Sequence, residues 1–144
     1  MKLIIVSGRS GSGKSVALRV LEDLGYYCVD NIPVNLLPAL THTVINDYDN
    51  VAVSLDVRNL PDDPADVLEI IDYLPNSVEL TIVYLDANDS DLIKRFSETR
   101  RLHPLIKKNI ALDQAIVLEK KLLDPISSRA DLYINTSQLT PHQL

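Results

Sequence analysis

Near its beginning the chain reads Gly8-Arg9-Ser10-Gly11-Ser12-Gly13-Lys14-Ser15, which matches the P-loop pattern G-x-x-x-x-G-K-S at every position. Glycines at three of these positions let backbone N–H groups turn inward toward phosphate oxygens. We expect the Lys14 ammonium to reach the β- and γ-phosphates of a nucleotide and the Ser15 hydroxyl to bind a bridging Mg²⁺ ion. The stretch therefore predicts a phosphate-binding loop.

The residues on both sides of the loop support this prediction. Residues 2–6 form a β-branched run suited to a buried strand, and Val16, Val20 and Leu24 then recur at helical spacing. A strand, a loop and a helix in this order let the helix N-terminus add its dipole and its unpaired N–H groups to the same anion site.

The composition limits the class of protein. The chain has 144 residues, of which 46% are hydrophobic, so it is long enough to bury the core of one domain. Its one cysteine, Cys28, lies in an apolar run and predicts a buried thiol in a reducing compartment. No apolar run approaches the roughly 20 residues of a membrane span. A net charge of −6 argues against a general nucleic-acid surface. We expect a soluble, cytoplasmic protein.

Beyond the P-loop, apolar extended runs alternate with helical patterns. The further strand candidates are residues 26–29, 51–55, 80–85 and 131–134. This alternation predicts an α/β fold, specifically a P-loop NTPase with a kinase-like three-layer α/β/α architecture and a mainly parallel sheet of about five strands.

Two features lie toward the end of the chain. One helical pattern places a core-facing stripe at Ala111, Ala115, Leu118 and Leu122. A second helix is expected to begin at Thr140-Pro141, only a few residues before the last residue. We therefore expect residues 1–144 to form one nucleotide-binding domain, the N-terminal part of a longer polypeptide.

Three of the expected strands are followed directly by an aspartate: Asp30, Asp56 and Asp86. The carboxyl ends of parallel strands border the ligand crevice, so these carboxylates should approach the phosphates. Asp56 is the preferred Walker B residue, which holds Mg²⁺ directly or through water, because polar Arg58 and Asn59 follow it. Asp86 is its rival, with a helix N-cap as the alternative role. Asp30 is either a site residue or a turn residue.

A basic stretch covers residues 94–108, with six Lys or Arg residues against one acid, Glu98. Arg100 and Arg101 are candidates for a lid that neutralises charge on a transferring phosphoryl group. The alternatives are a solvated helix face and a phosphate contact for RNA. His103 has no partner that the sequence identifies, so we expect an ordinary loop histidine.

Five motifs together resemble the RapZ/YvcJ family of P-loop nucleotide-binding proteins over the whole chain. They are residues 5–18, residues 23–31, Asp56-Val57-Arg58-Asn59, Thr99-Arg100-Arg101-Leu102-His103-Pro104 and Ser128-Arg129-Ala130-Asp131. The resemblance implies that ATP binds Gly8, Arg9, Ser10, Gly11, Ser12, Gly13, Lys14 and Ser15, and that GTP binds Asp56, Val57, Arg58 and Asn59. It also implies weak ATPase and GTPase activity.

The family resemblance further implies macromolecular partners. The family includes an RNase adapter that presents a small regulatory RNA of the amino-sugar pathway to RNase E. Its RNA binding is associated largely with a second half that this sequence lacks, so we expect this chain alone to bind RNA weakly or not at all.

Two functions of different classes follow. The first is an enzyme, a slow ATPase/GTPase or a small-molecule kinase, with Lys14, Asp56, Arg100 and Arg101 as catalytic residues and Ser15 and Asp56 as ligands of Mg²⁺. The second is an adapter whose bound nucleotide sets its conformation. The sequence leaves homo-oligomerisation, any kinase acceptor and the choice between ATP and GTP open, because it contains no N-K-x-D guanine motif. Residues 135–137 are a positional guess for the contact to the base.

Overall fold

A computed structural model describes residues 1–99, 103–105 and 111–138. Arg100, Arg101 and the expected helix at Thr140 lie outside the described residues. The described elements are, in chain order, β1 (Lys2–Gly8), α1 (Lys14–Asp23), β2 (Tyr27–Val29), the 3₁₀ turn η1 (Val34–Leu36), α2 (Leu37–Val44), β3 (Asn50–Leu55), the 3₁₀ turn η2 (Val57–Asn59), α3 (Asp66–Asp72), β4 (Glu79–Asp86), α4 (Asp89–Thr99), α5 (Leu112–Leu122), α6 (Asp124–Ser127), β5 (Leu132–Asn135) and the 3₁₀ turn η3 (Thr136–Gln138).

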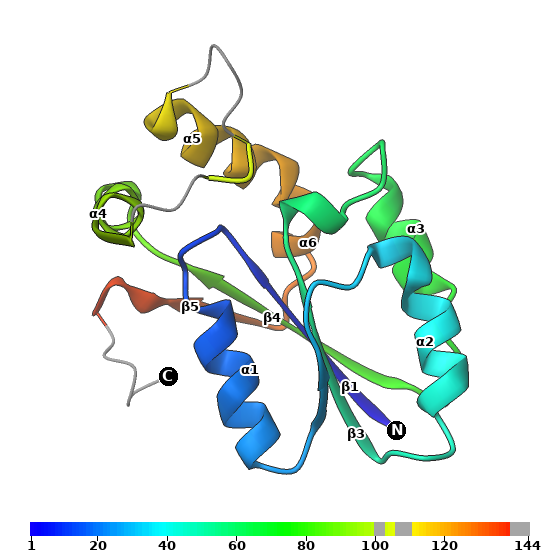
Figure 1. The fold of residues 1–144 in the computed structure, drawn as a ribbon. Helices are drawn as coiled ribbons and strands as arrows, with labels where there is room; N and C mark the ends of the chain where they lie inside the picture. Colours follow the sequence, from blue (N-terminus) through cyan, green and yellow to red (C-terminus); the bar gives the residue numbers. More distant parts are fainter. Residues whose placement is uncertain (100–102, 106–110, 139–144) are drawn as a thin grey trace.

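The sheet has five parallel strands in the order β2-β3-β1-β4-β5 (Figure 1). The central strand β1 pairs with β3 on one side and with β4 on the other, so that Ile5 is opposite both Val53 and Ile82. The carboxyl ends of β3 and β4 therefore flank the P-loop that follows β1. The predicted fold class and the predicted strands are confirmed.

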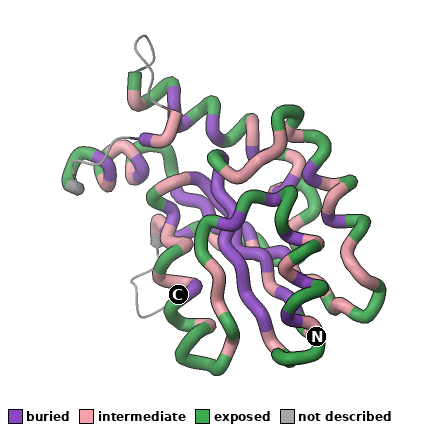
Figure 2. The backbone as a smooth tube through the Cα atoms, turned by 45° about the vertical axis from the view of Figure 1, so that its right-hand side comes forward, coloured by how far each residue is buried: buried purple, intermediate pink, exposed green. Residues whose placement is uncertain are grey.

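Helices cover both faces of the sheet, as expected for three layers. On one face, α2, α3 and α6 pack against a large apolar cluster that includes Leu3, Ile5 and Leu37. On the other face, α1 packs against a smaller cluster through Leu18 and Leu21. Figure 2 shows the buried strands between these layers and the exposed outer sides of the helices.

Helices α4 and α5 pack against each other beside the P-loop end of the sheet (Figure 1). Their contact is apolar and involves Ala87, Leu92 and Ile116. This position matters for function, because it brings residues far along the chain next to the phosphate-binding loop.

Two sequence predictions about the core need correction. The core-facing stripe predicted for α5 is only partly confirmed, because Ala115 is buried but Leu118 is 36% exposed, and the other buried residues of the helix are Ile116 and Glu119. The helix is turned in this way because the Glu119 carboxylate has hydrogen-bond partners inside the protein. The Cys28 thiol is half-buried rather than fully buried, and its Sγ lies 3.5 Å from the Leu18 carbonyl oxygen. Burial raises the pKa of this thiol, which keeps it protonated.

Candidate nucleotide site

The P-loop backbone adopts conformations that require glycine at two positions. At Gly8, φ is 152° and a Cβ atom would lie 2.0 Å from the Leu85 carbonyl oxygen. At Gly13, φ is 110°, and this residue caps the N-terminus of α1. The first helical hydrogen bond runs from Ala17 N–H to Gly13 O at 3.1 Å. The N–H groups of residues 14–16 precede this bond and are therefore available to an anion.

The Lys14 side chain folds back over the start of the loop. Its ammonium donates to the carbonyl oxygens of Gly8, at 2.8 Å, and Arg9, at 3.2 Å. Burial lowers the pKa of Lys14, and the nearby carboxylates of Glu119 and Asp56 oppose that shift. A bound phosphate would favour the charged ammonium in the same way, which suits Lys14 to the predicted contact with the terminal phosphates.

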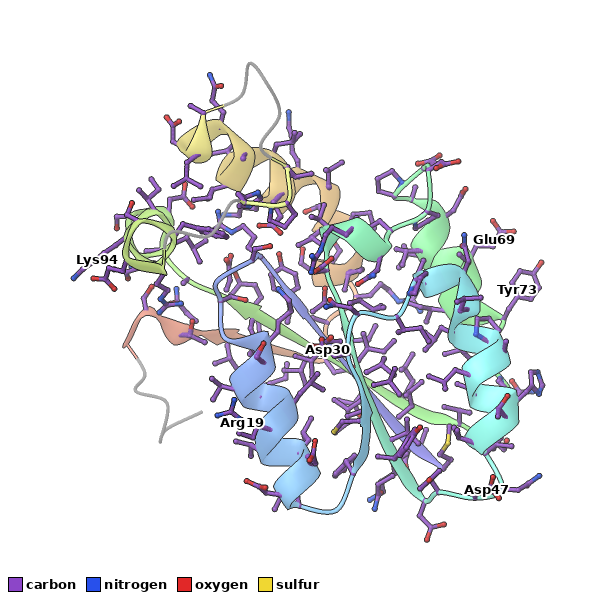
Figure 3. The ribbon with its side chains drawn as sticks, in the orientation of Figure 1. Arg19, Asp30, Asp47, Glu69, Tyr73 and Lys94 are labelled. Carbon is purple, nitrogen blue, oxygen red and sulfur yellow. The ribbon has the colours of Figure 1, made fainter. Side chains whose placement is uncertain are left out.

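A cavity of about 670 Å³ opens beside the loop and is of the size that small ligands occupy. Its walls bring together the P-loop, the ends of β2 and β3, and α4. The lining residues are Ser10, Gly11, Gly13, Lys14, Ser15, Val16, Asp30, Asn31, Asp56, Arg58, Arg95, Phe96 and Pro104. Figure 3 labels Asp30 on the segment that joins β2 to α2, across from the P-loop. Of the strand-end aspartates, Asp30 and Asp56 thus face the predicted phosphate site.

Asp56 lies at the end of β3 and is 4% exposed. Its carboxylate accepts hydrogen bonds from the Arg58 backbone N–H at 2.8 Å and from the Arg58 Nε at 3.0 Å, and the Asn59 side chain accepts from the Asp56 N–H at 2.9 Å. These bonds cap the turn η2. Within the segment that the resemblance assigns to GTP, Val57 is buried, whereas Asp56 and Arg58 line the cavity.

Asp86, at the end of β4, has a different role from either one predicted. Its carboxylate accepts from Arg9 Nε at 2.8 Å and from the Tyr133 hydroxyl at 2.8 Å. The Arg9 guanidinium also donates to Asp89 at 2.6 Å and to the Ala87 carbonyl oxygen at 2.9 Å. Burial lowers the pKa of Arg9, but the hydrogen bonds to the two carboxylates outweigh this and raise it overall. The buried Arg9 side chain therefore anchors the loop behind the cavity.

Asp30 and Asn31 connect β2 to β3 at the cavity wall. The Ser54 hydroxyl donates to the Asp30 carboxylate, and the Asn31 N–H donates to the Ser54 oxygen at 3.0 Å. Asn31 has φ of 54°, a left-handed conformation that asparagine tolerates better than most residues. Asp30 is thus held in place as a carboxylate of the site, and not only as part of a turn.

The site contains a buried acid that the sequence reading missed. Glu119, on α5 and 0% exposed, accepts from the Ser10 N–H at 2.9 Å and from the Ser10 hydroxyl at 2.7 Å. Its carboxylate also lies 2.8 Å from Nε2 of His103. His103 is 2% exposed, so the expectation of an ordinary loop histidine is wrong. The sequence signal for a buried Glu119 was its position four residues after Ala115, which places both side chains on the same face of the helix.

The side chains of the basic stretch that the structure describes point in different directions. Lys94 is exposed and points away from the protein (Figure 3). Arg95 turns toward the loop and donates to the Gly11 carbonyl oxygen at 2.7 Å and to the Thr136 hydroxyl at 3.2 Å. Thr136, one of the residues guessed to contact the base, is buried and donates to the Ser12 carbonyl oxygen at 2.8 Å. Arg95 therefore joins the described part of this stretch to the P-loop.

Across the described ranges, no three His, Cys, Asp or Glu side chains gather as a metal site. Mg²⁺ usually takes one or two protein oxygens together with substrate phosphates and water. The residues predicted to hold Mg²⁺, Ser15 and Asp56, line the same cavity. Among the described residues, no helix combines the length and the apolar character needed to cross a membrane.

Together, the sheet order, the loop and the cavity define a P-loop α/β protein with a kinase-like fold. The shikimate kinase of Bacteroides thetaiotaomicron superposes with a TM-score of 0.62 over 98% of this chain and 90% of that one, at 16% identity. A gluconokinase of Sinorhizobium meliloti 1021 gives a TM-score of 0.59 over 95% of this chain and 83% of that one, at 21% identity. At these identities the likeness establishes the fold alone.

The family follows from the sequence comparison. The profile of the RapZ-like N-terminal domain matches residues 1–144, so the chain belongs to this family, as the motifs predicted. A "Nucleotide-binding protein" of Colwellia psychrerythraea (strain 34H) is 82% identical over all 144 residues, which make up 51% of that protein. The chain thus spans about half the length of the curated relatives it matches. Nucleotide binding is the activity that their names give.

Proposed function

We propose that this chain is a nucleotide-binding domain that takes ATP or GTP with Mg²⁺ in the cavity beside the P-loop and hydrolyses it slowly in the cytoplasm. The observation that carries the proposal is the position of Lys14, Ser15 and Asp56 around one cavity of about 670 Å³. The Lys14 ammonium and the first N–H groups of α1 supply the anion site, and Ser15 and Asp56 supply oxygen ligands for the metal.

The arrangement divides phosphoryl chemistry among residues of this chain. Lys14 would neutralise the terminal phosphates, and Mg²⁺ between phosphates, Ser15 and Asp56 would neutralise the developing charge. Arg100 and Arg101 remain proposed lid residues. Pro104 and Arg95, on either side of them in sequence, line the cavity, which supports this assignment.

The substitution Lys14→Ala tests the proposal. Charge-assisted hydrogen bonds contribute about 1.5 to 3 kcal/mol each, so we expect affinity for MgATP to fall by about 10-fold to 150-fold. Titration of the intact protein with a fluorescent ATP analogue measures the affinity, and circular dichroism checks the fold. Unchanged MgATP affinity in a folded Lys14→Ala protein would show that the P-loop is not the phosphate-binding site.

We further propose that the domain serves an RNase adapter, in which nucleotide binding modulates the handling of a small regulatory RNA and of RNase E. The proposal rests on membership of the RapZ-like family. With a net charge of −6, the chain alone should bind RNA weakly at physiological salt. Filter binding of the RNA to these 144 residues and to the full-length protein tests this. Equally tight binding by both would locate the RNA surface on this domain instead.

A small-molecule kinase is the second candidate, favoured by the Asp30 carboxylate across the cavity from the P-loop. A carboxylate in that position is suited to receive the proton of an acceptor hydroxyl. One measurement distinguishes the kinase from the slow hydrolase: the rate of ADP release with and without a panel of hydroxylated metabolites. An acceptor that accelerates ADP release above hydrolysis and becomes phosphorylated would establish the kinase.

A further inference from the structure

The buried Glu119 carboxylate behind the P-loop accepts three hydrogen bonds. Two come from Ser10, through its N–H at 2.9 Å and its hydroxyl at 2.7 Å. The third comes from His103, whose Nε2 lies 2.8 Å from Oε1 of Glu119. A buried carboxylate is costly unless such partners satisfy it, so this acid is held in one orientation.

The tautomer of His103 follows from its second contact. The Leu105 N–H donates to Nδ1 of His103 at 3.0 Å, so this nitrogen carries a lone pair. The imidazole proton therefore lies on Nε2 and points at Glu119. Because the ring is neutral in this arrangement, His103 orients the carboxylate without neutralising it.

The Ser10 hydroxyl has one proton, and this proton is donated in the hydrogen bond to Glu119. Toward the cavity, which Ser10 lines, the oxygen can offer only lone pairs. A phosphate oxygen gains no hydrogen bond from such a group, whereas a water molecule or a hydroxyl does. The Lys14 ammonium lies 3.2 Å from the carbonyl oxygen of Arg9, the residue before Ser10. Since that ammonium serves the β- and γ-phosphates, Ser10 lies at the end of the site nearest the terminal phosphate.

We propose that Ser10 is a catalytic residue that orients the attacking water on the terminal phosphate, and that Glu119, held by His103, is the positioning residue that receives the displaced proton. The inference rests on the proposed nucleotide hydrolysis. It assigns roles to one loop residue and two distant residues that the P-loop motif does not specify.

The water oxygen forms a bond to the γ-phosphorus, and the bond from that phosphorus to the β,γ-bridging oxygen breaks, so the nucleoside diphosphate leaves with the electron pair. A proton of the water passes to the Ser10 oxygen, and the Ser10 proton passes to Glu119. Inorganic phosphate is released, and the proton on the buried Glu119 then leaves by the reverse path, through the Ser10 hydroxyl to water in the cavity.

Two substitutions in the intact protein test the relay. Ser10→Ala removes the hydroxyl. Glu119→Gln keeps the size and the acceptor oxygen, but its amide group would donate to Ser10 and turn the hydroxyl proton toward the cavity. Loss of a general base costs about 10²-fold to 10⁴-fold, so we expect kcat for MgATP to fall at least 100-fold in both variants, with Kd changed less than about threefold. Ser10→Thr, which retains a hydroxyl, should keep kcat within about tenfold of the parent protein.

The measurements are single-turnover hydrolysis of γ-labelled ATP and equilibrium titration of the same nucleotide. Thr43→Ala is the control, because it removes an exposed hydroxyl of α2 that bonds only the Ala39 carbonyl oxygen among the described contacts. Parental kcat in Ser10→Ala would overturn the relay while leaving nucleotide hydrolysis in place. A parent protein that binds MgATP without turning it over would instead refute hydrolysis itself, and the relay with it.

Discussion

Two aspartates flank the P-loop at the ends of β3 and β4, the strands on either side of β1, and they are almost equally buried, at 4% exposure for Asp56 and 3% for Asp86. They differ in the arginine side chain that forms an ion pair with each carboxylate. The side chain of Arg58, bound to Asp56, is 57% exposed and lines the cavity, whereas that of Arg9, bound to Asp86, is 2% exposed behind the loop. The Arg58 side chain can therefore break its ion pair with Asp56 and be hydrated by solvent, whereas the buried Arg9 side chain cannot do so at Asp86.

This difference teaches that burial and position at a strand end do not define a site residue. An exposed arginine can be replaced at a carboxylate by a metal ion at small cost, because surface ion pairs contribute about 0–1 kcal/mol. A buried guanidinium that loses its carboxylate stays uncompensated in a medium of low dielectric constant. Asp86 therefore supports the architecture of the loop, whereas Asp56 is the residue that we propose for the nucleotide and its metal.

The largest expected effect separates the two residues by stability. Asp86→Ala should lower the free energy of unfolding by about 3 kcal/mol, the low end for a broken buried pair, because Asp89 and the Ala87 carbonyl oxygen still bind Arg9. Asp56→Ala is the matched variant and should lose less than about 1.5 kcal/mol, the value of an ordinary hydrogen bond. Urea unfolding of both proteins measures the difference. A larger loss at Asp56 would reverse the comparison.

The next effect concerns the metal. We expect Asp56→Asn to weaken Mg²⁺-dependent ATP binding by about 10-fold to 100-fold, the range for groups that orient a bound metal and its water. Asp86→Asn should change it much less, because Asp86 faces Arg9. Titrations of ATP with Mg²⁺ and with EDTA isolate the metal-dependent part. If Asp86→Asn shows the greater loss, the Walker B role belongs to β4.

A smaller effect tests whether Arg58 competes for the Asp56 carboxylate. Arg58→Ala removes the exposed cation and should raise the apparent Mg²⁺ affinity of the nucleotide complex, by up to about fivefold for a pair worth 1 kcal/mol. Magnesium titration at fixed ATP concentration gives the value. Weaker magnesium binding in this variant would mean that Arg58 contacts the nucleotide directly.

The smallest effect lies at the other aspartate. Tyr133→Phe deletes one hydrogen bond to Asp86, and we expect a loss of about 0.5 kcal/mol, low in the usual range because Tyr133 is 54% exposed. Burial and the Asp86 hydrogen bond raise the pKa of Tyr133 to about 12, so its hydroxyl remains a donor at neutral pH. Thermal unfolding measures the loss. Nucleotide affinity should not change, since Asp86 has no direct part in the site.

The strands and the loop were predictable because their signals are local. Residues 51–55 and 80–85 are continuous apolar runs of the kind that parallel strands need, and the loop has a fixed pattern. The roles of Arg9 and Glu119 were not predictable in this way. Charged residues are usually exposed, and the contacts that hold these two inside join positions 77 and 109 residues apart.

Those sequence separations also affect the order in which the chain can fold while it is being synthesised on the ribosome. The phosphate-binding loop is synthesised before the elements that hold it, because β1 pairs with β3 and β4, and Ser10 is hydrogen-bonded to Glu119. We expect the loop to stay unformed through most of synthesis and to acquire affinity for nucleotide only after α5 has emerged, because non-local contacts cannot form earlier. Arrested nascent chains of increasing length, probed with labelled ATP, should therefore gain binding in one late step.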